Sequence, residues 1–279
     1  MMRAVDHLVM PFNTLPEACD WFERIGFVVA PEAAHPFGTG NACVFFADGR
    51  YLEPLSIVDP AAYDAAKAEG HLFVERDADV RNLADRPAIS GLAFSSSDAL
   101  ADREQLLEEE AGEDGLVEFG RTMRLPDGGA AELSFRLAFA AIHAADAPSF
   151  FCCEARHSVR PDRSALTTHP NGATGVTGVT LTAPDPQVFR DYLSAVCGSP
   201  AENNPDGSLT FALECGRLDI VPRDVGSFAI ESVTITVADL AFARKFWQGQ
   251  GIACAEESDG VAVDCPNGRG RIRFIEERS

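Results

Sequence analysis

Apolar and polar positions along the chain repeat one pattern, in which a strand is followed by a helix and then by several shorter strands. In the first copy the apolar run 4–10 predicts a strand, and Gly26 is suited to end the helix that follows it. The apolar residues of this helix fall on one face: Leu15, Ala18, Cys19, Phe22 and Ile25. Extended runs are expected at 27–30, 42–47 and 51–58. The pattern therefore predicts a βαβββ module.

The same order returns three more times. First strands are predicted at 89–95, 178–182 and 230–237, and the helices that follow them at 98–112, 186–196 and 240–251. Strands outnumber helices three or four to one, which is unlike the even alternation of a doubly wound sheet. The sequence therefore predicts an α+β fold of four tandem βαβββ modules.

Two segments lie outside the repeat. Residues 160–175 are rich in Pro, Thr, Asn and Gly and show no periodicity, which is typical of a linker. We therefore expect an N-terminal pair of modules in residues 1–165 and a C-terminal pair in residues 166–279. The insert 59–86 carries a helical stretch near 61–69, and we expect the insert to cover the mouth of a site.

Charge and composition narrow the class of partner. The formal net charge is −20, from 43 acidic and 23 basic residues, and so acidic a surface repels nucleic acid and anionic membranes. No apolar run approaches the roughly 18 residues of a membrane span, and Asp6 and His7 come too early for a signal peptide. The eight cysteines are scattered without a CxxC pair, as is typical of reduced thiols. The sequence thus predicts a cytoplasmic protein whose partner is a small molecule.

Several stretches resemble a known family. They are VDHL at 5–8, WFERIGF at 21–27, HPFGTGNA at 35–42, GRYLE at 49–53 and HPNG at 169–172. Together they resemble the glyoxalase-like branch of the vicinal oxygen chelate superfamily, most closely over residues 4–58. In that superfamily βαβββ modules pair so that their strands form an open bowl. The resemblance therefore implies two open bowl-shaped sheets in this chain.

The resemblance also implies a metal site. The superfamily commonly holds a divalent metal on the first and fourth strands of each module, and these positions match His7 and Glu53 in the first module and Glu154 in the second. The two glutamates are also the expected catalytic groups. One imidazole and two carboxylates suit Zn, Mn, Ni, Co or Fe. The expected site is thus His7, Glu53 and Glu154.

Some of the matching positions carry no ligand. The residue that matches His7 is Gly91 in the second module, Gly178 in the third and Ser232 in the fourth. The C-terminal pair of modules is therefore expected to be a structural partner without a metal. In the N-terminal pair at most three of the four ligand positions are filled.

Three further residues are candidates for contact with a substrate: His35, Asn41 and Arg156. His35 and Asn41 belong to a glycine-rich loop that would lie at the rim of the bowl, although a plain turn is an equally simple interpretation. Arg156 alternates onto the same face of its strand as Glu154. An ion pair between Arg156 and either glutamate would remove the need for a metal. The HPNG stretch is interpreted as a turn.

Three functions stay open at this point. The first is a metal-dependent lyase, isomerase or dioxygenase that acts on a small oxygenated metabolite. The second is a metal-free protein that binds or sequesters a small molecule, as drug-resistance relatives do. The third is an interaction module whose bowl is filled by side chains such as Phe45 or Phe94. One chain carries enough modules for two bowls, so a homodimer is possible but is not needed to complete a site.

Overall fold

The computed structural model describes residues 2–124, 130–141, 144, 146–158, 162–224 and 227–277. The helices are α1 (Leu15–Arg24), α2 (Pro60–Ala68), α3 (Leu72–Arg81), α4 (Ala99–Glu108), α5 (Arg190–Cys197) and α6 (Leu240–Gly249). Short 3₁₀ turns lie at Ser164–Leu166 and Pro186–Phe189. None of the helices in these ranges is long and apolar enough to cross a membrane.

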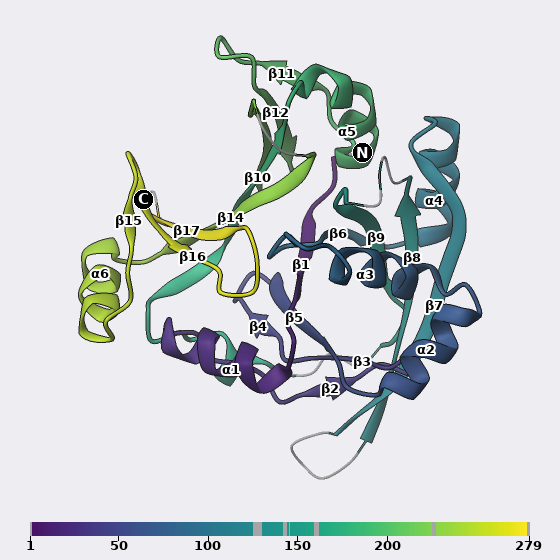
Figure 1. Ribbon diagram of the computed structural model, residues 1–279, viewed down its shortest axis with the longest axis horizontal. Coiled ribbons are helices and arrows are strands. Elements are labelled where there is room, and N and C mark those ends of the chain that lie inside the picture. The colour runs from purple at the N-terminus through teal and green to yellow at the C-terminus, as the bar shows by residue number, and fades with distance from the viewer. Residues whose placement is uncertain are drawn as a thin grey trace.

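The strands form two sheets (Figure 1). The N-terminal sheet contains β1 (Val5–Pro11), β2 (Ala33–Ala34), β3 (Thr39–Asn41), β4 (Val44–Phe45), β5 (Tyr51–Ile57), β6 (Gly91–Ser96), β7 (Gly112–Arg124), β8 (Ala130–Ala140) and β9 (Ser149–Ala155). The C-terminal sheet contains β10 (Ala173–Ala183), β11 (Ala201–Asn203), β12 (Leu209–Leu213), β13 (Gly216–Pro222), β14 (Ala229–Val237), β15 (Ala255–Glu256), β16 (Gly260–Asp264) and β17 (Arg271–Glu276).

Strand pairing shows the four modules directly. In each module the first strand runs parallel to the last, as β1 with β5, β6 with β9, β10 with β13 and β14 with β17. The first strands of neighbouring modules pair antiparallel at the centre of each sheet, β1 with β6 and β10 with β14. The prediction of four βαβββ modules in two sheets is therefore confirmed.

One predicted strand of the first module is not present. Residues 27–30 do not join the sheet, and the strand that follows α1 is the two-residue β2. The backbone N–H of Val28 donates to Nδ1 of His169, and that of Ala30 donates to the carbonyl of Cys43. Backbone groups that are satisfied in this way have no need of a strand partner, so the apolar run packs as an extended loop.

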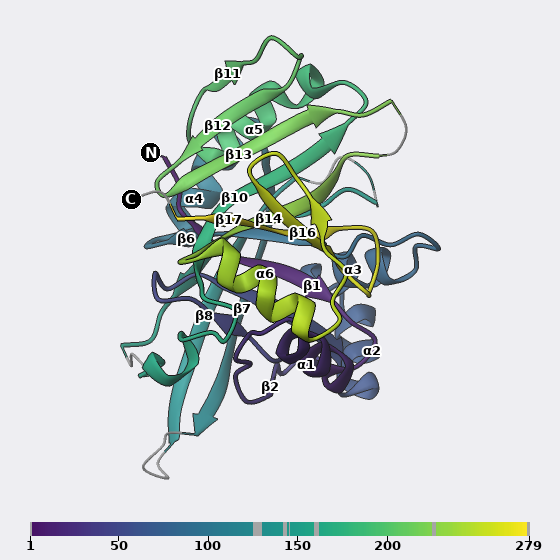
Figure 2. The ribbon, with the colours of Figure 1, turned by 90° about the vertical axis from the view of Figure 1, so that its left-hand side faces the viewer.

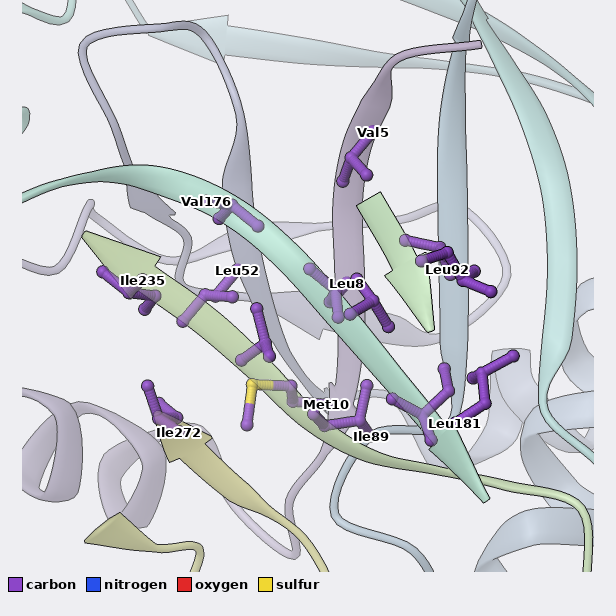
Figure 3. Packing of buried hydrophobic residues seen from close by; sticks show 14 of the residues in the cluster. Val5, Leu8, Met10, Leu52, Ile89, Leu92, Val176, Leu181, Ile235 and Ile272 are labelled. Atoms are coloured by element: carbon purple, nitrogen blue, oxygen red, sulfur yellow. The ribbon is translucent and has the colours of Figure 1, made fainter. Parts of the chain in front are cut away.

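The two sheets share one core. The side chains of β1, β5 and β6 that point away from the concave face of the N-terminal sheet meet the inner face of β10, β14 and β17, as Figure 3 shows. Met10 and Leu8 on β1 thus lie in the same cluster as Leu181 on β10, and all three are fully buried. In Figure 2 the C-terminal sheet lies above the strands β1 and β6 of the N-terminal sheet. Burial of both faces stabilises the arrangement of the two module pairs.

The insert after β5 covers the opposite, concave face of the N-terminal sheet. Tyr63 of α2 and Phe73 of α3 pack there against Val9 and Leu55, in a second apolar cluster. The helix near 61–69 was predicted, whereas α3 was not, because its buried residues include Arg76 and Asp77 and follow no single apolar stripe. The insert therefore closes one end of the concave surface.

The HPNG stretch holds the two halves of the chain together. His169 is 6% exposed; its Nδ1 accepts the N–H of Val28 at 3.0 Å, and its Nε2 donates to the carbonyl of Phe45 at 3.0 Å. These bonds fix a neutral tautomer, and burial lowers the pKa of His169 below 6.5. The HPNG stretch is thus a buried turn that bonds the segments around Val28 and Phe45.

This lowered pKa predicts a pH dependence of stability. Below pH 6.5 the unfolded chain binds a proton at His169 that the folded chain excludes, so the contribution of His169 is complete above pH 6.5 and is lost as the pH falls through the folded-state pKa. His169→Gln should lower the free energy of unfolding at pH 7.5 by about 1–3 kcal/mol, because the N–H of Val28 loses its acceptor. The variant should also lose less stability than the wild type between pH 7.5 and 5.5, as measured by denaturant unfolding. Parallel losses in the two proteins would contradict this assignment.

Candidate active site in the N-terminal sheet

The concave face of the N-terminal sheet holds a cavity of about 410 Å³. Its walls come from β1, β3, β4, β5, β7, β8 and β9 and from the turn between β2 and β3 that carries His35. A volume of this size is in the range of small-molecule sites. Phe45 lines the cavity without filling it, and Phe94 lies in the core on the other side of the sheet. The bowl is therefore open, which counts against the interaction-module hypothesis.

Strand alternation turns His7 and Glu53 toward this cavity. On β1, His7 and Val9 face inward while Leu8 and Met10 enter the core between the sheets. In the parallel pair of β1 and β5, Glu53 is the register partner of Val9, two residues along from the level of His7. The first and fourth strands thus bring an imidazole and a carboxylate to one point.

Glu53 is the centre of a buried polar cluster. Its carboxylate is 6% exposed, and its Oε1 accepts a hydrogen bond from Nδ2 of Asn41 at 2.6 Å. Its Oε2 lies 3.4 Å from Nε2 of His7, and Oε1 lies 3.9 Å from Nε2 of His35. The structure therefore brings together four of the six predicted site residues: His7, His35, Asn41 and Glu53.

His7 is held by a second carboxylate. Its Nδ1 lies 2.7 Å from Oδ1 of Asp6, and its ring stacks on Tyr51 with 4.5 Å between centroids. Burial alone would lower the pKa of His7, but the hydrogen bond to Asp6 and the charges of Glu53 and Asp6 outweigh burial and raise that pKa above 6.5. A carboxylate on Nδ1 fixes the ring so that Nε2 points to Glu53, which is the arrangement that orients metal-binding histidines.

His35 is a neutral positioning group. Burial lowers its pKa to about 4, although the charge of Glu53 opposes this effect. Its Nδ1 lies 2.9 Å from Oγ1 of Thr39, and its Nε2 accepts from Nδ2 of Asn41 at 3.3 Å. Asn41 therefore uses one amide hydrogen for His35 and the other for Glu53, which fixes the direction of the carboxylate.

The turn between His35 and β3 is anchored to the insert by Gly38. This glycine has a φ of +87°, and a Cβ there would lie 2.3 Å from the backbone nitrogen of Tyr63. Its carbonyl accepts the N–H groups of Val58 and Asp59. The close approach that glycine permits thus sets the loop against the start of α2.

Glu154 and Arg156 do not reach the cavity, contrary to the prediction. On β9 the inward residues are Phe151, Cys153 and Ala155, so Glu154 points to the other face. There Glu154 accepts the N–H of Ala99 at 3.2 Å, at the start of α4, and lies 3.6 Å from Arg136. Arg156 forms a partly exposed ion pair with Glu118 at 3.3 Å. Neither residue is placed to hold a metal beside His7.

Spacing to the helix gives the counterparts in the second module. Gly91 lies seven residues before the N-cap Asp98 of α4, as His7 lies seven residues before the N-cap Thr14 of α1, so Gly91 takes the place of His7. Glu53 pairs with Val9, two residues beyond His7, and the matching pair two residues beyond Gly91 is Ala93 with Phe151. The counterpart of Glu53 on β9 is therefore Phe151 and not the predicted Glu154.

The same spacing holds in the C-terminal modules. Gly178 and Ser232 each lie seven residues before the N-cap of their module, Asp185 and Asp239, and so both take the place of His7. Neither residue is a histidine or a carboxylate, so neither C-terminal module offers a match to His7.

The donor atoms fit a divalent metal ion in part. Nε2 of His7 and Oε2 of Glu53 converge at 3.4 Å, and a buried carboxylate is stabilised by a cation. A donor atom of Asp6, one of His7 and Sγ of Cys153 also lie within 4.8 Å of one another. Burial, followed by the charges of Asp6 and Glu53, raises the pKa of Cys153 well above its usual value, so without a cation it is a thiol. His7 and Glu53 are thus the candidate anchors, and among the described residues Cys153 groups with His7 and Asp6 rather than with Glu53.

Several cavity residues were not found from the sequence: Asp6, Tyr51, Arg121, Cys153, His157 and Arg163. Tyr51 and Glu53 share a face by strand alternation, so that signal was present in the sequence. Arg163 belongs to the segment 160–175 that was interpreted as a linker, and His157 lies just before that segment. No local pattern shows that either residue returns to the bowl, because each follows the last strand of its module.

The site and the fold define a class of protein. Four βαβββ modules, with an imidazole and a carboxylate on the first and fourth strands of one bowl, are the architecture of the vicinal oxygen chelate superfamily. Residues 5–197 match the model of the family described as glyoxalase-like domain, and the chain therefore belongs to that family. No curated protein sequence matches the chain.

Solved structures with the same fold include a hypothetical protein from Staphylococcus aureus, with a TM-score of 0.71 and 13% identity over 99% of this chain and 100% of that one. A mutant of 4-hydroxymandelate synthase from Streptomyces coelicolor has a TM-score of 0.62 and 11% identity over 99% of this chain and 92% of that one. The Mn(II)-bound glyoxalase from Novosphingobium aromaticivorans has a TM-score of 0.60 and 10% identity over 100% of this chain and 84% of that one. At these identities the likeness establishes the fold.

Proposed function

We propose that this protein is an enzyme that binds a divalent metal ion between His7 and Glu53 and acts on a small oxygenated compound in the N-terminal bowl. The observation that carries the proposal is the approach of Nε2 of His7 to Oε2 of Glu53 at 3.4 Å inside a buried cavity. Solved relatives in fold include a glyoxalase that binds Mn(II) and a 4-hydroxymandelate synthase. The reaction is of the lyase, isomerase or dioxygenase type.

The residues of the polar cluster would have separate roles in catalysis. When bound, a divalent ion supplies Lewis-acid polarisation of a substrate oxygen. Glu53 is the group that accepts or returns a proton, because Asn41 fixes Oε1 and leaves Oε2 directed into the site. Asp6 orients His7, and His35 orients Asn41. The aromatic walls and the insert exclude water around this cluster.

Metal uptake tests the proposal. Purified protein is treated with a chelator and titrated with Mn, Co, Ni and Zn by calorimetry, with the bound metal counted by elemental analysis after gel filtration. We expect one ion per chain. If none of the four metals binds, the metal-dependent function is wrong.

Cobalt gives a separate test of Cys153. If this thiol becomes a ligand, the Co(II) protein should show a thiolate-to-cobalt charge-transfer band in the near ultraviolet, and Cys153→Ser should remove the band while Co(II) still binds at His7 and Glu53. Cys43→Ser is the matched control, since Cys43 is a second buried thiol of the same cavity. A band that Cys153→Ser leaves unchanged would exclude Cys153 as a ligand.

A metal-free binding protein is the second candidate, and one observation favours it. Gly91 takes the place of His7 in the second module, and Glu154 points away from the cavity, so neither predicted ligand position of that module supplies a ligand there. The hydrogen bonds of Glu53 to Asn41 and of His7 to Asp6 also satisfy the cluster without a cation. This function predicts ligand binding that is unaffected by chelators.

A further inference from the structure

Two arginines line the cavity without a carboxylate partner among the described residues. Most arginines in this acidic chain are ion-paired, as Arg136 is with Glu118 and Arg81 with Asp77. Arg121 on β7 and Arg163 before the 3₁₀ turn at 164–166 form no such pair within the ranges that the structure describes, and both face the bowl. A guanidinium cannot lose its proton in a protein, so both are fixed positive charges beside a mostly aromatic surface.

Arg163 is connected to His7 by a stack of rings. Its guanidinium lies 3.9 Å from the centroid of the Phe45 ring, which packs on Tyr51 at 5.2 Å. Tyr51 in turn stacks on His7 at 4.5 Å. Arg163 is therefore held at the far end of one aromatic wall, and its guanidinium has no carboxylate partner in the part of the chain that the structure describes.

Arg121 occupies a similar place on another wall. It is two residues from Phe119 on β7 and so shares its face, and the Phe119 ring packs on His35 at 5.5 Å between centroids. Arg121 lines the same cavity as His35 and Glu53. Arg121 is thus separated from the polar cluster of Glu53 by one ring, Phe119, and Arg163 by two, Phe45 and Tyr51.

Between these charges and Glu53 the cavity is aromatic. Its walls contain six phenylalanines: Phe37, Phe45, Phe73, Phe119, Phe135 and Phe151. A planar apolar body would be contacted there by ring faces and edges, while its desolvation costs little. A small sugar or a polyphosphate would leave most of its polar groups unpaired against these rings.

We propose that the substrate or ligand of this bowl is a small organic carboxylate with a planar, preferably aromatic, body. Its carboxylate binds Arg121 and Arg163, the body lies between the phenylalanines, and the opposite, oxygenated end reaches His7 and Glu53. A carboxylate fits better than a phosphate, because the planar fork of a guanidinium matches it and because Asp6 and Glu53 at the other end repel a dianion. This inference rests on the proposed function for its choice of site.

Binding of simple probes to the full chain tests the inference. Phenylacetate and benzoate, their neutral amides phenylacetamide and benzamide, and inorganic phosphate are titrated by calorimetry into wild-type protein, once after chelation and once with Co(II). We expect both carboxylates to bind at least about tenfold more tightly than the amides, and phosphate to bind more weakly than either carboxylate. Arg121→Gln and Arg163→Gln should each lower carboxylate affinity about tenfold, and amide affinity hardly at all.

Arg190→Gln is the matched control, since Arg190 is half-buried outside the cavity and its guanidinium donates to Gln187 and Asn203. Thermal melting of each variant verifies folding. Equal affinity for acids and amides, tighter binding of phosphate, or carboxylate binding that both cavity variants leave unchanged would overturn the inference. The two proposals fail separately: arginine-dependent carboxylate binding without any metal uptake overturns only the metal-dependent function. If metal binds but the amides bind as tightly as the acids, only the inference of a carboxylate ligand is overturned.

Discussion

Loss of His7 or of the Glu53 charge should lower affinity for a divalent metal by more than about 100-fold. Loss of an outer-sphere partner alone typically costs about 10–100-fold, and these two residues supply the donor atoms themselves. The informative substitutions are His7→Asn and Glu53→Gln, which keep most of the volume of two side chains that are 4% and 6% exposed. The measurement is calorimetric titration of chelator-treated protein with Mn, Co, Ni and Zn.

Glu154→Gln is the control, because the sequence alignment predicts that Glu154 binds the metal and the structure predicts that it does not. Its carboxylate accepts the N–H of Ala99 on the other face of β9, so we expect metal affinity to stay unchanged while stability falls slightly. Near-ultraviolet circular dichroism of the His7 and Glu53 variants establishes that the bowl is folded. If Glu154→Gln lowered the affinity for the metal as much as Glu53→Gln did, the direction of Glu154 on β9 would have to be wrong.

Trp247→Ala should produce the largest loss of stability among single changes outside the cavity, about 3–5 kcal/mol. Trp247 is fully buried, packs on Phe274 at 4.5 Å between centroids and donates from Nε1 to the carbonyl of Ile25 at 2.9 Å. The same carbonyl accepts Nδ2 of Asn171 at 3.0 Å. The indole thus ties α6 of the last module to the end of α1 in the first.

Two companion variants separate packing from the hydrogen bond. Trp247→Phe retains most of the apolar contact and loses the donor, so about 1–3 kcal/mol is expected. Phe242→Ala, on the same helix but 53% exposed, should change the free energy of unfolding by no more than about 0.5 kcal/mol. Urea unfolding measures all three. A loss for Trp247→Ala as small as that for Phe242→Ala would show that the two sheets are not held together through this contact.

The polar cluster shows how far sequence reasoning reaches into a site. His7 and Glu53 were found because each is a polar residue at an inward position of an apolar strand and matches the first and fourth strands of its module. His35 and Asn41 were found because a glycine-rich loop between two strands returns to the sheet edge. Whether any of these residues binds a metal or a substrate stays a prediction.

The prediction that Glu154 faces the site was wrong for a physical reason that the sequence does not show. Strands β7 and β8 of the second module are longer than those of the first, so the last strand, β9, could be aligned only loosely from the sequence. Alternation along β9 places Phe151 and Cys153 toward the cavity and Glu154 on the other face. The position of Arg163 in the cavity could not be predicted for another reason. Its segment has no periodicity, and without a period the sequence does not indicate which way a side chain points.

The sequence by itself determined the local structure: the order of strands and helices, the apolar face of each helix, and the inward direction of His7 and Glu53 within their own strands. These features follow from periods of two and of 3.6 residues, which short-range geometry imposes. Tertiary structure alone decided which residues of the second module lie near His7 and Glu53. It also decided that the HPNG stretch is buried and bonds Val28 and Ile25. Only in the folded chain do Arg121 and Arg163 line the aromatic cavity. Those outcomes depend on register and packing between segments far apart in the chain, for which no local period exists.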